Sequence, residues 1–240
     1  MEIFTTKDTT LTKSGVLLIT KSIGELIIGS TRDINSFTTE QISIEVEKIG
    51  GNLQITNGFM SLRDFILLTT FNADAVTSDP AYKTTAVCEI CEDGAIQLAD
   101  KDVIKIQLTG LISGQTYVVN ALEMPSTSHK VLNFENKSMA SDEKSKFFDV
   151  DACDLVLIDN STTIEEIALT YLNGVTVRYT LWEVQVQSRA VDPVAYVQQD
   201  GKVTSAFPAK LQIPLFGVQQ LEIRKEQGAV INLIQRLEAN

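Results

Sequence analysis

Alternation of apolar and polar residues with a period of two is the feature that most constrains the fold of this chain. In the segment ISIEVEK, Ile42, Ile44 and Val46 share one face and polar residues occupy the other. The segment DVIKIQLTG, residues 102–110, repeats the pattern. Such alternation is typical of strands that bury one face. The chain therefore predicts a protein built mainly from half-buried β-strands.

About fifteen short segments have strand character, and turn signals such as Asp93-Gly94 and Asp200-Gly201 separate them. They do not alternate with helices, which favours sandwiches or closed barrels over a parallel α/β sheet. The segment VTVRYTLWEVQVQ, residues 175–187, is predicted as one long strand with a β-bulge at Trp182–Glu183, where its alternation changes phase. The other predicted strands include GVLLIT, GELIIG, TTAVCEI, AIQLA, QTYVVNAL, DLVLID, AKLQIPL, QQLEIRK and GAVINLIQRL.

Length and composition indicate a globular protein. The 240 residues suffice for one large β-domain or for two smaller ones, and 44% are hydrophobic against 21% charged. The formal net charge is −11 and no basic stripe is present, so direct nucleic-acid binding is not expected. No apolar run is as long as a membrane span, and the N-terminal residues lack the features of a signal peptide. We therefore expect the chain to fold in the cytoplasm.

One helix has a clear start signal in NLQITNGFMSLRDF, residues 52–65. Ser61 is suited to accept a hydrogen bond from a free amide of the first turn, and Asp64 is placed to reach back to it, as in a capping box. Met60 and Phe65 occupy the two positions of a hydrophobic staple. The segment therefore predicts a strand, a polar turn and then a helix.

A second helix is predicted in STTIEEIALTYLNG. Thr162 with Glu165, or Thr163 with Glu166, forms a capping-box pattern, and the following Asn-Gly pair is a C-terminal stop signal. The segment 154–167 also aligns with 52–65 without a gap, so strand, turn, cap and helix recur. This recurrence predicts two copies of one β-sandwich with one short helix in each.

The boundary between the two copies is predicted in the polar segment 124–146, which reads as a linker or a long surface loop. Its VLNFEN piece is also compatible with a strand of the second copy. The predicted domains are an N-terminal sandwich over 1–125 and a C-terminal sandwich over 126–240.

The cysteines are the first candidate for chemistry. Cys88 and Cys91 form a C-x-x-C pair in a strand-like run, whereas a redox pair would start at a helix N-terminus. Zinc binding would require two more ligands, and Cys153 and the one histidine, His129, are the candidates. Their spacing does not match a zinc knuckle, so ordinary half-buried cysteines and a surface histidine are the preferred interpretation.

The carboxylates offer two further candidates. Glu45 and Glu47 resemble the pair of a sandwich-fold glycosidase, but they lie on the polar face of a strand. Asp149, Asp151 and Asp154 are close in sequence and calcium is a minor alternative, although the EF-hand pattern is broken. Nucleophile elbows, P-loops and HExxH motifs are absent. We therefore predict that the chain is not an enzyme, with no catalytic, cofactor-binding or metal-binding residues and no cofactor.

At QISIEVEKIGGNLQITNGFMSLRDFILLTT, residues 41–70, the sequence resembles the N-terminal jelly roll of the major coat protein of PM2-like, membrane-containing icosahedral bacteriophages. The matching elements are a strand with Glu on its polar face, a glycine turn, a second short strand and a helix that carries leucine and aspartate. The resemblance implies a double jelly roll, which consists of two eight-stranded sandwiches side by side with their strands perpendicular to the capsid surface.

The same resemblance implies a structural viral function. Three copies would form a pseudo-hexagonal homotrimer that tiles an icosahedral shell over an internal membrane. The implied partners are lattice neighbours of the same chain, penton and minor capsid proteins, and the internal viral membrane with its proteins. The implied location is the virion, assembled in the host cytoplasm.

Three alternatives stay open from the sequence. The chain fits less well as a penton or other minor coat protein, because such proteins usually have a single jelly roll with an extra domain. A non-viral tandem carbohydrate-binding module is disfavoured by the single Trp and five Tyr, and by the missing secretion signal. A sandwich hydrolase would require an acid–base pair that the sequence does not provide.

Overall fold

The computed structural model describes residues 1–6, 10–70, 76–78, 80–128, 130–191 and 209–239. The described chain divides into two compact units. Unit 1 covers Met1–Asn133, and unit 2 begins at Phe134 and extends to Glu238. The predicted domain division at 125/126 stays a prediction, and each unit is described separately below.

Unit 1 contains two facing sheets. One has the strand order β1-β10-β3-β7, and the other has the order β2-β9-β4-β5 with β6 also paired to β4. A short parallel pair, β11-β8, stands apart from them. The elements are β1 (Glu2–Thr5), β2 (Lys13–Ile19), β3 (Ile23–Ser30), the 3-10 helix η1 (Ile34–Ser36), β4 (Gln41–Glu47), β5 (Leu53–Gln54), β6 (Met60–Ser61), α1 (Leu62–Thr69), β7 (Thr84–Glu89), β8 (Ala95–Ile96), β9 (Val103–Thr109), β10 (Tyr117–Glu123) and β11 (Thr127–Ser128).

Unit 2 also contains two sheets. Their strand orders are β12-β19-β14-β17 and β13-β18-β15-β16. The elements are β12 (Val131–Met139), β13 (Ser145–Asp149), β14 (Cys153–Asp159), β15 (Ile164–Tyr171), β16 (Thr176–Thr180), α2 (Leu181–Val191), β17 (Lys210–Pro214), β18 (Val218–Lys225) and β19 (Ile231–Ala239).

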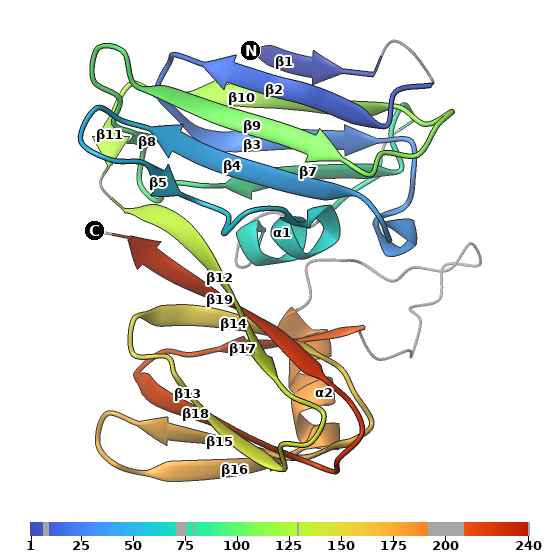
Figure 1. The fold of residues 1–240 in the computed structure, drawn as a ribbon, viewed down its shortest axis with the longest axis vertical. Coiled ribbons are helices and arrows are strands. Elements are labelled where there is room, and N and C mark those ends of the chain that lie inside the picture. The colour runs from blue at the N-terminus through green and yellow to red at the C-terminus, as the bar shows by residue number, and fades with distance from the viewer. Residues whose placement is uncertain (7–9, 71–75, 79, 129, 192–208, 240) are drawn as a thin grey trace. The chain divides into compact units, whose positions relative to one another are not determined.

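The two units share one topology. When the eight principal strands of each unit are counted in chain order, both units show the sheet orders 1-8-3-6 and 2-7-4-5. This arrangement of eight strands in two sheets is a jelly roll. In both units the helix follows the fifth principal strand and precedes the sixth, as Figure 1 lets the reader follow. The predictions of a duplicated all-β chain, a double jelly roll and one short helix in each copy are confirmed.

The alternation seen in the sequence builds the core of unit 1. Ile42, Ile44 and Val46 of β4 have no exposed surface, whereas Glu45 and Glu47 lie on the outer face of the same strand. Strand β9 pairs with β4 over its whole length and buries its own alternate residues in the same way. Removal of these apolar side chains from water is the main stabilising term for such a sandwich.

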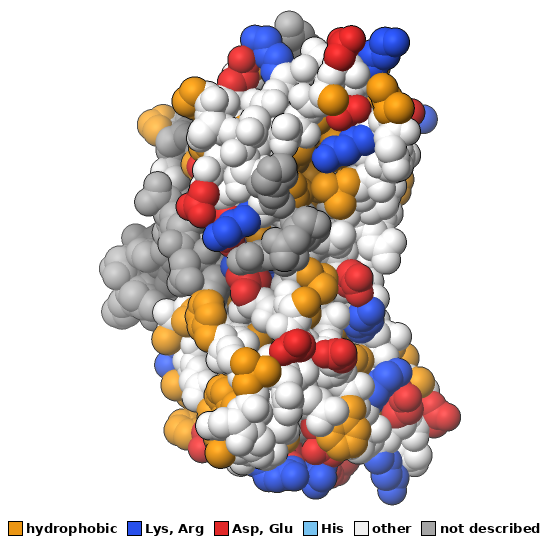
Figure 2. All heavy atoms as spheres, turned by 90° about the vertical axis from the view of Figure 1, so that its left-hand side faces the viewer, with side chains coloured by type: hydrophobic (Ala, Val, Ile, Leu, Met, Phe, Trp, Pro, Cys, Tyr) orange, Lys and Arg blue, Asp and Glu red, His pale blue; other side chains and the backbone are white. Residues whose placement is uncertain are grey.

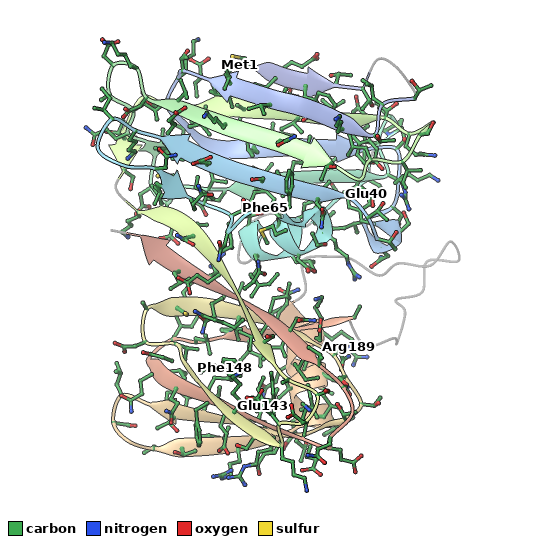
Figure 3. All side chains as sticks on the ribbon, in the orientation of Figure 1. Met1, Glu40, Phe65, Glu143, Phe148 and Arg189 are labelled. Atoms are coloured by element: carbon green, nitrogen blue, oxygen red, sulfur yellow. The ribbon has the colours of Figure 1, made fainter. Side chains whose placement is uncertain are left out.

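The core of unit 2 lies between its two sheets and is built on the same principle. Val156 and Ile158 come from β14, and Leu221 and Ile223 come from β18 on the facing sheet. Phe148 of β13 joins the same cluster and is labelled between the sheets in Figure 3. Strands of both sheets therefore contribute apolar side chains to one core.

The predicted second helix is wrong. Residues 164–171 form the strand β15, which pairs with β16 on one side and β18 on the other. Ile167 and Leu169 join the core of the unit as alternate residues. Thr163 is not a helix cap, because its amide donates to Ser161 Oγ at 3.3 Å in the turn before β15. The Asn173-Gly174 pair lies in the hairpin turn between β15 and β16, with Gly174 at φ +80°.

The long bulged strand predicted over 175–187 is also wrong in its second half. Residues 176–180 form β16, but the chain then continues as helix α2 from Leu181. The phase change at Trp182–Glu183 therefore marks the start of a helix and not a β-bulge. Leu181, Val184 and Ser188 fall on the face of α2 that packs on the unit, since they recur at helical spacing.

The predicted alignment of the two copies is wrong for the same reason. The sequence alignment sets 52–65 against 154–167, which pairs the helix α1 with the strand β15. In the structure the counterpart of α1 is α2, so the duplication is correct but its alignment is not. The segment 124–146 is mostly strand rather than linker, because it contains β11, β12 and the start of β13, and VLNFEN lies in β12. The Asp93-Gly94 turn is present, and Asp200-Gly201 lies outside the described residues.

Candidate assembly surfaces

Helix α1 lies against strands of both sheets of unit 1. It contacts β7 of one sheet, and β4 and β6 of the other. Ser61 Oγ accepts a hydrogen bond from the Asp64 amide at 3.3 Å, which confirms the predicted N-cap. Met60 and Phe65, the predicted staple residues, are both buried. The sequence signal for this helix therefore specified its start correctly.

Helix α2 begins with a capping box that the sequence analysis missed. The Thr180 amide donates to Glu183 Oε2 at 2.8 Å, and the Glu183 amide donates to Thr180 Oγ1 at 3.4 Å. The hydrogen bond from the Thr180 amide lowers the pKa of Glu183. The T-x-x-E spacing of these residues is the signal that identifies the helix start in the sequence.

The same helix covers a sheet edge in unit 2. Ser188 is fully buried on α2, and its hydroxyl accepts a hydrogen bond from the Gln212 amide of β17 at 3.0 Å. The hydroxyl also donates to the Gln212 carbonyl at 3.2 Å. Strand β17 ends its sheet, so Ser188 occupies backbone positions that another strand would use. The helix also packs on β15 and β16 of the other sheet.

Unit 1 contains a buried carboxylate. The side chain of Glu40 has no exposed surface, and it accepts hydrogen bonds from Arg32 Nη1 at 2.6 Å and from the Tyr117 hydroxyl at 2.7 Å. The amides of Thr38 and Thr39 donate to its other oxygen at 3.0 and 3.2 Å. Burial, followed by the bond to Glu40, raises the pKa of Tyr117 to about 12. Figure 3 labels Glu40 just before β4, so this network ties the loop before β4 to β10.

Unit 2 carries a network of charges on the outer face of one sheet. Arg178 of β16 pairs with Glu166 of β15 and approaches Glu222 of β18 at 3.8 Å. Arg224 Nε donates to Glu222 at 2.7 Å, and Ser145 of β13 donates to the same oxygen at 2.7 Å. Burial tends to raise the pKa of Glu222, but the bonds from Arg224 and Ser145 outweigh it and lower this pKa. The network joins all four strands of this sheet.

Exposed apolar side chains are present on both units. In unit 2, Figure 2 shows such side chains gathered on the surface. Leu172 lies in the β15–β16 turn and Phe216 in the β17–β18 turn, and each exposes about two thirds of its surface (66% and 67%). Phe147 lies on the outer face of β13, where it is paired across the sheet with Glu222. Large exposed apolar side chains often mark places where another molecule binds.

The cysteines do not form a reactive site among the described residues. Cys88, Cys91 and Cys153 are all free thiols and all buried. Burial raises the pKa of Cys88 and of Cys153 to about 12, so both remain protonated at neutral pH. The backbone of Cys91 forms an isolated antiparallel β-bridge with Val131, and the Cys91 thiol lies 3.7 Å from the Ser128 carbonyl. The remaining zinc candidate, His129, lies outside the described residues.

Three of the carboxylate candidates have polar partners in the structure. Glu45 accepts a hydrogen bond from Asn52, and Glu47 pairs with Lys105 at 2.6 Å on the outer face of unit 1. Asp154 is paired with Arg236. In the described part of the chain, no three His, Cys, Asp or Glu side chains come together as a metal site requires. Neither α1 nor α2 is long and apolar enough to cross a membrane.

Comparisons of the sequence give no relative. No protein-family model matches the chain. No curated protein matches it either.

Comparisons of the structure give clear matches. The fold is that of the double jelly-roll capsid lineage. The major capsid protein P2 from bacteriophage PM2 is similar with a TM-score of 0.55 and 12% identity, over 94% of this chain and 91% of that one. A chain of Sulfolobus turreted icosahedral virus is similar with a TM-score of 0.53 and 10% identity, over 93% of this chain and 85% of that one.

These matches confirm, at the level of the fold, the resemblance that was found in residues 41–70. At 10% and 12% identity they establish a common fold. The PM2 protein is a major capsid protein.

Proposed function

We propose that this chain is a major capsid protein that forms pseudo-hexagonal homotrimers and tiles an icosahedral shell over an internal membrane. The observation that carries the proposal is the repeated jelly-roll topology, with a helix after the fifth strand of each copy, matched over 94% of the chain to a major capsid protein. A duplicated sandwich suits such a shell because a trimer of two-domain chains presents six similar sides to its neighbours.

Several finer features belong to the same proposal. The two jelly rolls would stand side by side with their strands perpendicular to the shell, and the division at 125/126 would separate them. Penton and minor capsid proteins would be further partners, and the internal membrane would lie beneath the shell. The chain would assemble in the host cytoplasm and reside in the virion.

The surfaces described above support a role in self-association. The helices cover flanks of the sandwiches, so the surfaces left for neighbours are sheet faces and turns. Obligate interfaces between subunits bury about 2,000 Å² or more and are richer in apolar surface than transient ones. Exposed side chains such as Phe147, with 58% of its surface accessible, are the kind of residue that such interfaces cover.

Light scattering on the purified chain tests the proposal directly. We expect a stable trimer at micromolar concentration and a single cooperative melt for both units. Electron microscopy of particles from the source, with a gel of their proteins, should show icosahedral shells in which this chain is the dominant band.

The contrary results have clear meanings. A stable monomer that unfolds in two separate melts would contradict the capsid proposal and favour a tandem binding module, which a glycan array would then test. A low copy number in the particles would instead indicate a penton or minor coat protein.

A further inference from the structure

Each unit contains one Asn-Gly pair, Asn57-Gly58 in unit 1 and Asn173-Gly174 in unit 2. The first pair lies between β5 and β6, the second lies between β15 and β16, and all four residues are exposed. Both glycines have a positive φ, +75° for Gly58 and +80° for Gly174. The pairs are therefore alike in residues, exposure and glycine conformation, and they differ in their hydrogen bonds.

An Asn-Gly pair carries its own chemistry, because the backbone can attack the asparagine side chain. The glycine amide nitrogen forms a bond to Cγ of the asparagine, and the side-chain NH₂ leaves with the amide proton as ammonia. Water then opens the resulting cyclic succinimide at either carbonyl, which yields aspartate or isoaspartate. Glycine favours the attack because it has no Cβ to keep its nitrogen away from the side chain. The reaction consumes water and requires no enzyme or cofactor.

The pair in unit 2 is held away from this reaction by two hydrogen bonds. The Gly174 amide, which would be the nucleophile, donates to the Tyr171 carbonyl at 2.8 Å. Asn173 Oδ1 accepts from the Val175 amide at 3.0 Å, so the group that would be attacked is fixed as well. The Tyr171 amide also donates to the Val175 carbonyl at 2.9 Å and closes the hairpin. Attack at Asn173 therefore requires this turn to open first.

The pair in unit 1 has neither constraint. Among the described residues, no group forms a hydrogen bond with the Gly58 amide or with the Asn57 side chain. A Cβ placed on Gly58 would meet no atom within 4 Å, so the surroundings leave this turn room to move. Rotation of the Asn57 side chain toward the Gly58 nitrogen therefore breaks no hydrogen bond within the described chain.

We propose that Asn57 is a site of spontaneous deamidation in the folded protein, and that Asn173 is protected by its turn. The product carries an additional negative charge, and isoaspartate also lengthens the main chain between Asn57 and Gly58. The modified bond lies just after Thr56, whose hydroxyl accepts a hydrogen bond from the Ile44 amide at 2.7 Å. The modification therefore falls beside the contact between β4 and the segment that follows β5.

The test follows both sites in the same molecules. The purified full chain is incubated in warm, mildly alkaline buffer and digested at mildly acidic pH, and mass spectrometry quantifies the deamidated form of each peptide. We expect Asn57 to deamidate roughly tenfold faster than Asn173 or more, because the Asn173 turn must break hydrogen bonds before it reacts. Similar rates at the two sites, or a faster rate at Asn173, would overturn the proposal.

The chain unfolded in guanidinium chloride is the control for neighbouring residues, since Thr56 precedes one pair and Leu172 the other. Both pairs lose their turns in the unfolded chain, so we expect the two rates to approach each other. An equally large preference for Asn57 in the unfolded chain would assign the difference to sequence and would contradict the role of the turns.

Two matched variants complete the test. Asn57→Gln keeps an amide but lengthens the side chain, which disfavours the ring closure. The acidic species that accumulates in the original chain, seen by ion-exchange chromatography, should be lost in this variant. Asn173→Gln should leave that species unchanged. Persistence of the acidic species in Asn57→Gln would place the main site elsewhere in the chain and overturn the assignment to Asn57.

Discussion

The two jelly rolls share their strand order but differ in where they place polar groups and how they use their helix. Unit 1 buries the carboxylate of Glu40 within a full set of hydrogen bonds, and most residues of α1 are buried. Unit 2 places its largest ion-pair network on an outer sheet face, and only Val184 and Ser188 of α2 are buried. The largest polar network is therefore internal in unit 1 and on an outer sheet face in unit 2, although unit 2 also buries the charged residues Lys225 and Arg236.

The difference shows that the strand order of this fold does not depend on where the charged and polar side chains are placed. The strand order requires only alternate apolar residues and turns at the right places, and both units satisfy that requirement. Where a charge is placed decides how much the unit depends on it, because a buried charge without its partner is far more destabilising than an exposed one. The predictions below test this contrast, from the largest expected effect to the smallest.

Removal of the buried carboxylate should have the largest effect. Glu40→Ala leaves Arg32 and the Tyr117 hydroxyl without their common acceptor, so we expect a loss of about 3–5 kcal/mol in the free energy of unfolding. Glu166→Ala in the exposed network of unit 2 should lose at most about 1 kcal/mol. Chemical denaturation of both variants measures the difference. Equal losses would show that the two networks are energetically alike.

Substitution of one glycine in each unit should give the next largest difference in stability. Gly110 in unit 1 has φ +68°, and a Cβ there would lie 1.9 Å from the Thr39 carbonyl oxygen. Gly217 in unit 2 has φ +70° and open space around the same position. We expect Gly110→Ala to destabilise by about 3 kcal/mol, because backbone atoms must move, and Gly217→Ala by about 1 kcal/mol from its φ alone. Thermal melts of the two variants compare them, and a milder effect at Gly110 would mean that the Thr39 loop yields easily.

The helix caps should give smaller changes. Ser61→Ala removes the cap of the buried helix α1 and should destabilise the protein by about 1 kcal/mol. Thr180→Ala removes the cap of the more exposed α2 and should have about half that effect. Thr163→Ala serves as the control, since Thr163 caps no helix and its hydroxyl forms a hydrogen bond with Ser161 Oγ at 2.8 Å. A loss of stability at Thr163 clearly greater than that at Ser61 would contradict the assignment of β15.

Lowering the pH should destabilise unit 2 before unit 1, and no such effect is expected at neutral pH. Burial opposes the charge of Glu222 and Asp159, but hydrogen bonds, from Arg224 and Lys210 respectively, lower both pKa values in the folded chain. A lowered pKa in the folded state gives stability that is present above the ordinary carboxyl range and is lost as the pH falls through the folded pKa. Hydrogen exchange with mass spectrometry should therefore show unit 2 losing protection before unit 1 below about pH 4.

The variant Glu222→Gln provides the control for that experiment. This variant should reduce the pH dependence of hydrogen-exchange protection in peptides from β18 and leave that of peptides from β4 unchanged. Earlier loss of protection in unit 1 would show that the lowered pKa values of Glu222 and Asp159 do not limit stability in acid.

Much of the strand pattern and the helix α1 could be predicted from the sequence because their signals are local. The alternation in β4 and β9 determines which of their faces is buried. Ser61 and its hydrogen-bond partner Asp64 lie within four residues of each other and mark the start of the helix. The buried Glu40 network could not be predicted, since its partners Arg32 and Tyr117 are brought together only by the loop before β4 and by β10.

Strand β15 shows where local signals conflict. Ile164, Ile167, Ala168 and Tyr171 match a helical face, while Ile167 and Leu169 also match a strand. Pairing with β16 and β18 on both sides decides in favour of the strand, and that pairing is not visible in a short window. The Asn173-Gly174 pair, interpreted from the sequence as a helix stop, is the local signal for a hairpin, because this dipeptide between two apolar runs is typical of one.

The hydroxyl of Ser188 has a consequence for how such a chain behaves when it is abundant. A sheet edge with free amides and carbonyls recruits strands from any nearby copy, and the resulting growth has no natural end. By engaging the amide and carbonyl of Gln212, one buried serine removes that route at β17. Under the proposed capsid function, copies at high concentration would then associate through other surfaces, and a closed symmetric assembly would not be diverted into a fibre at this edge.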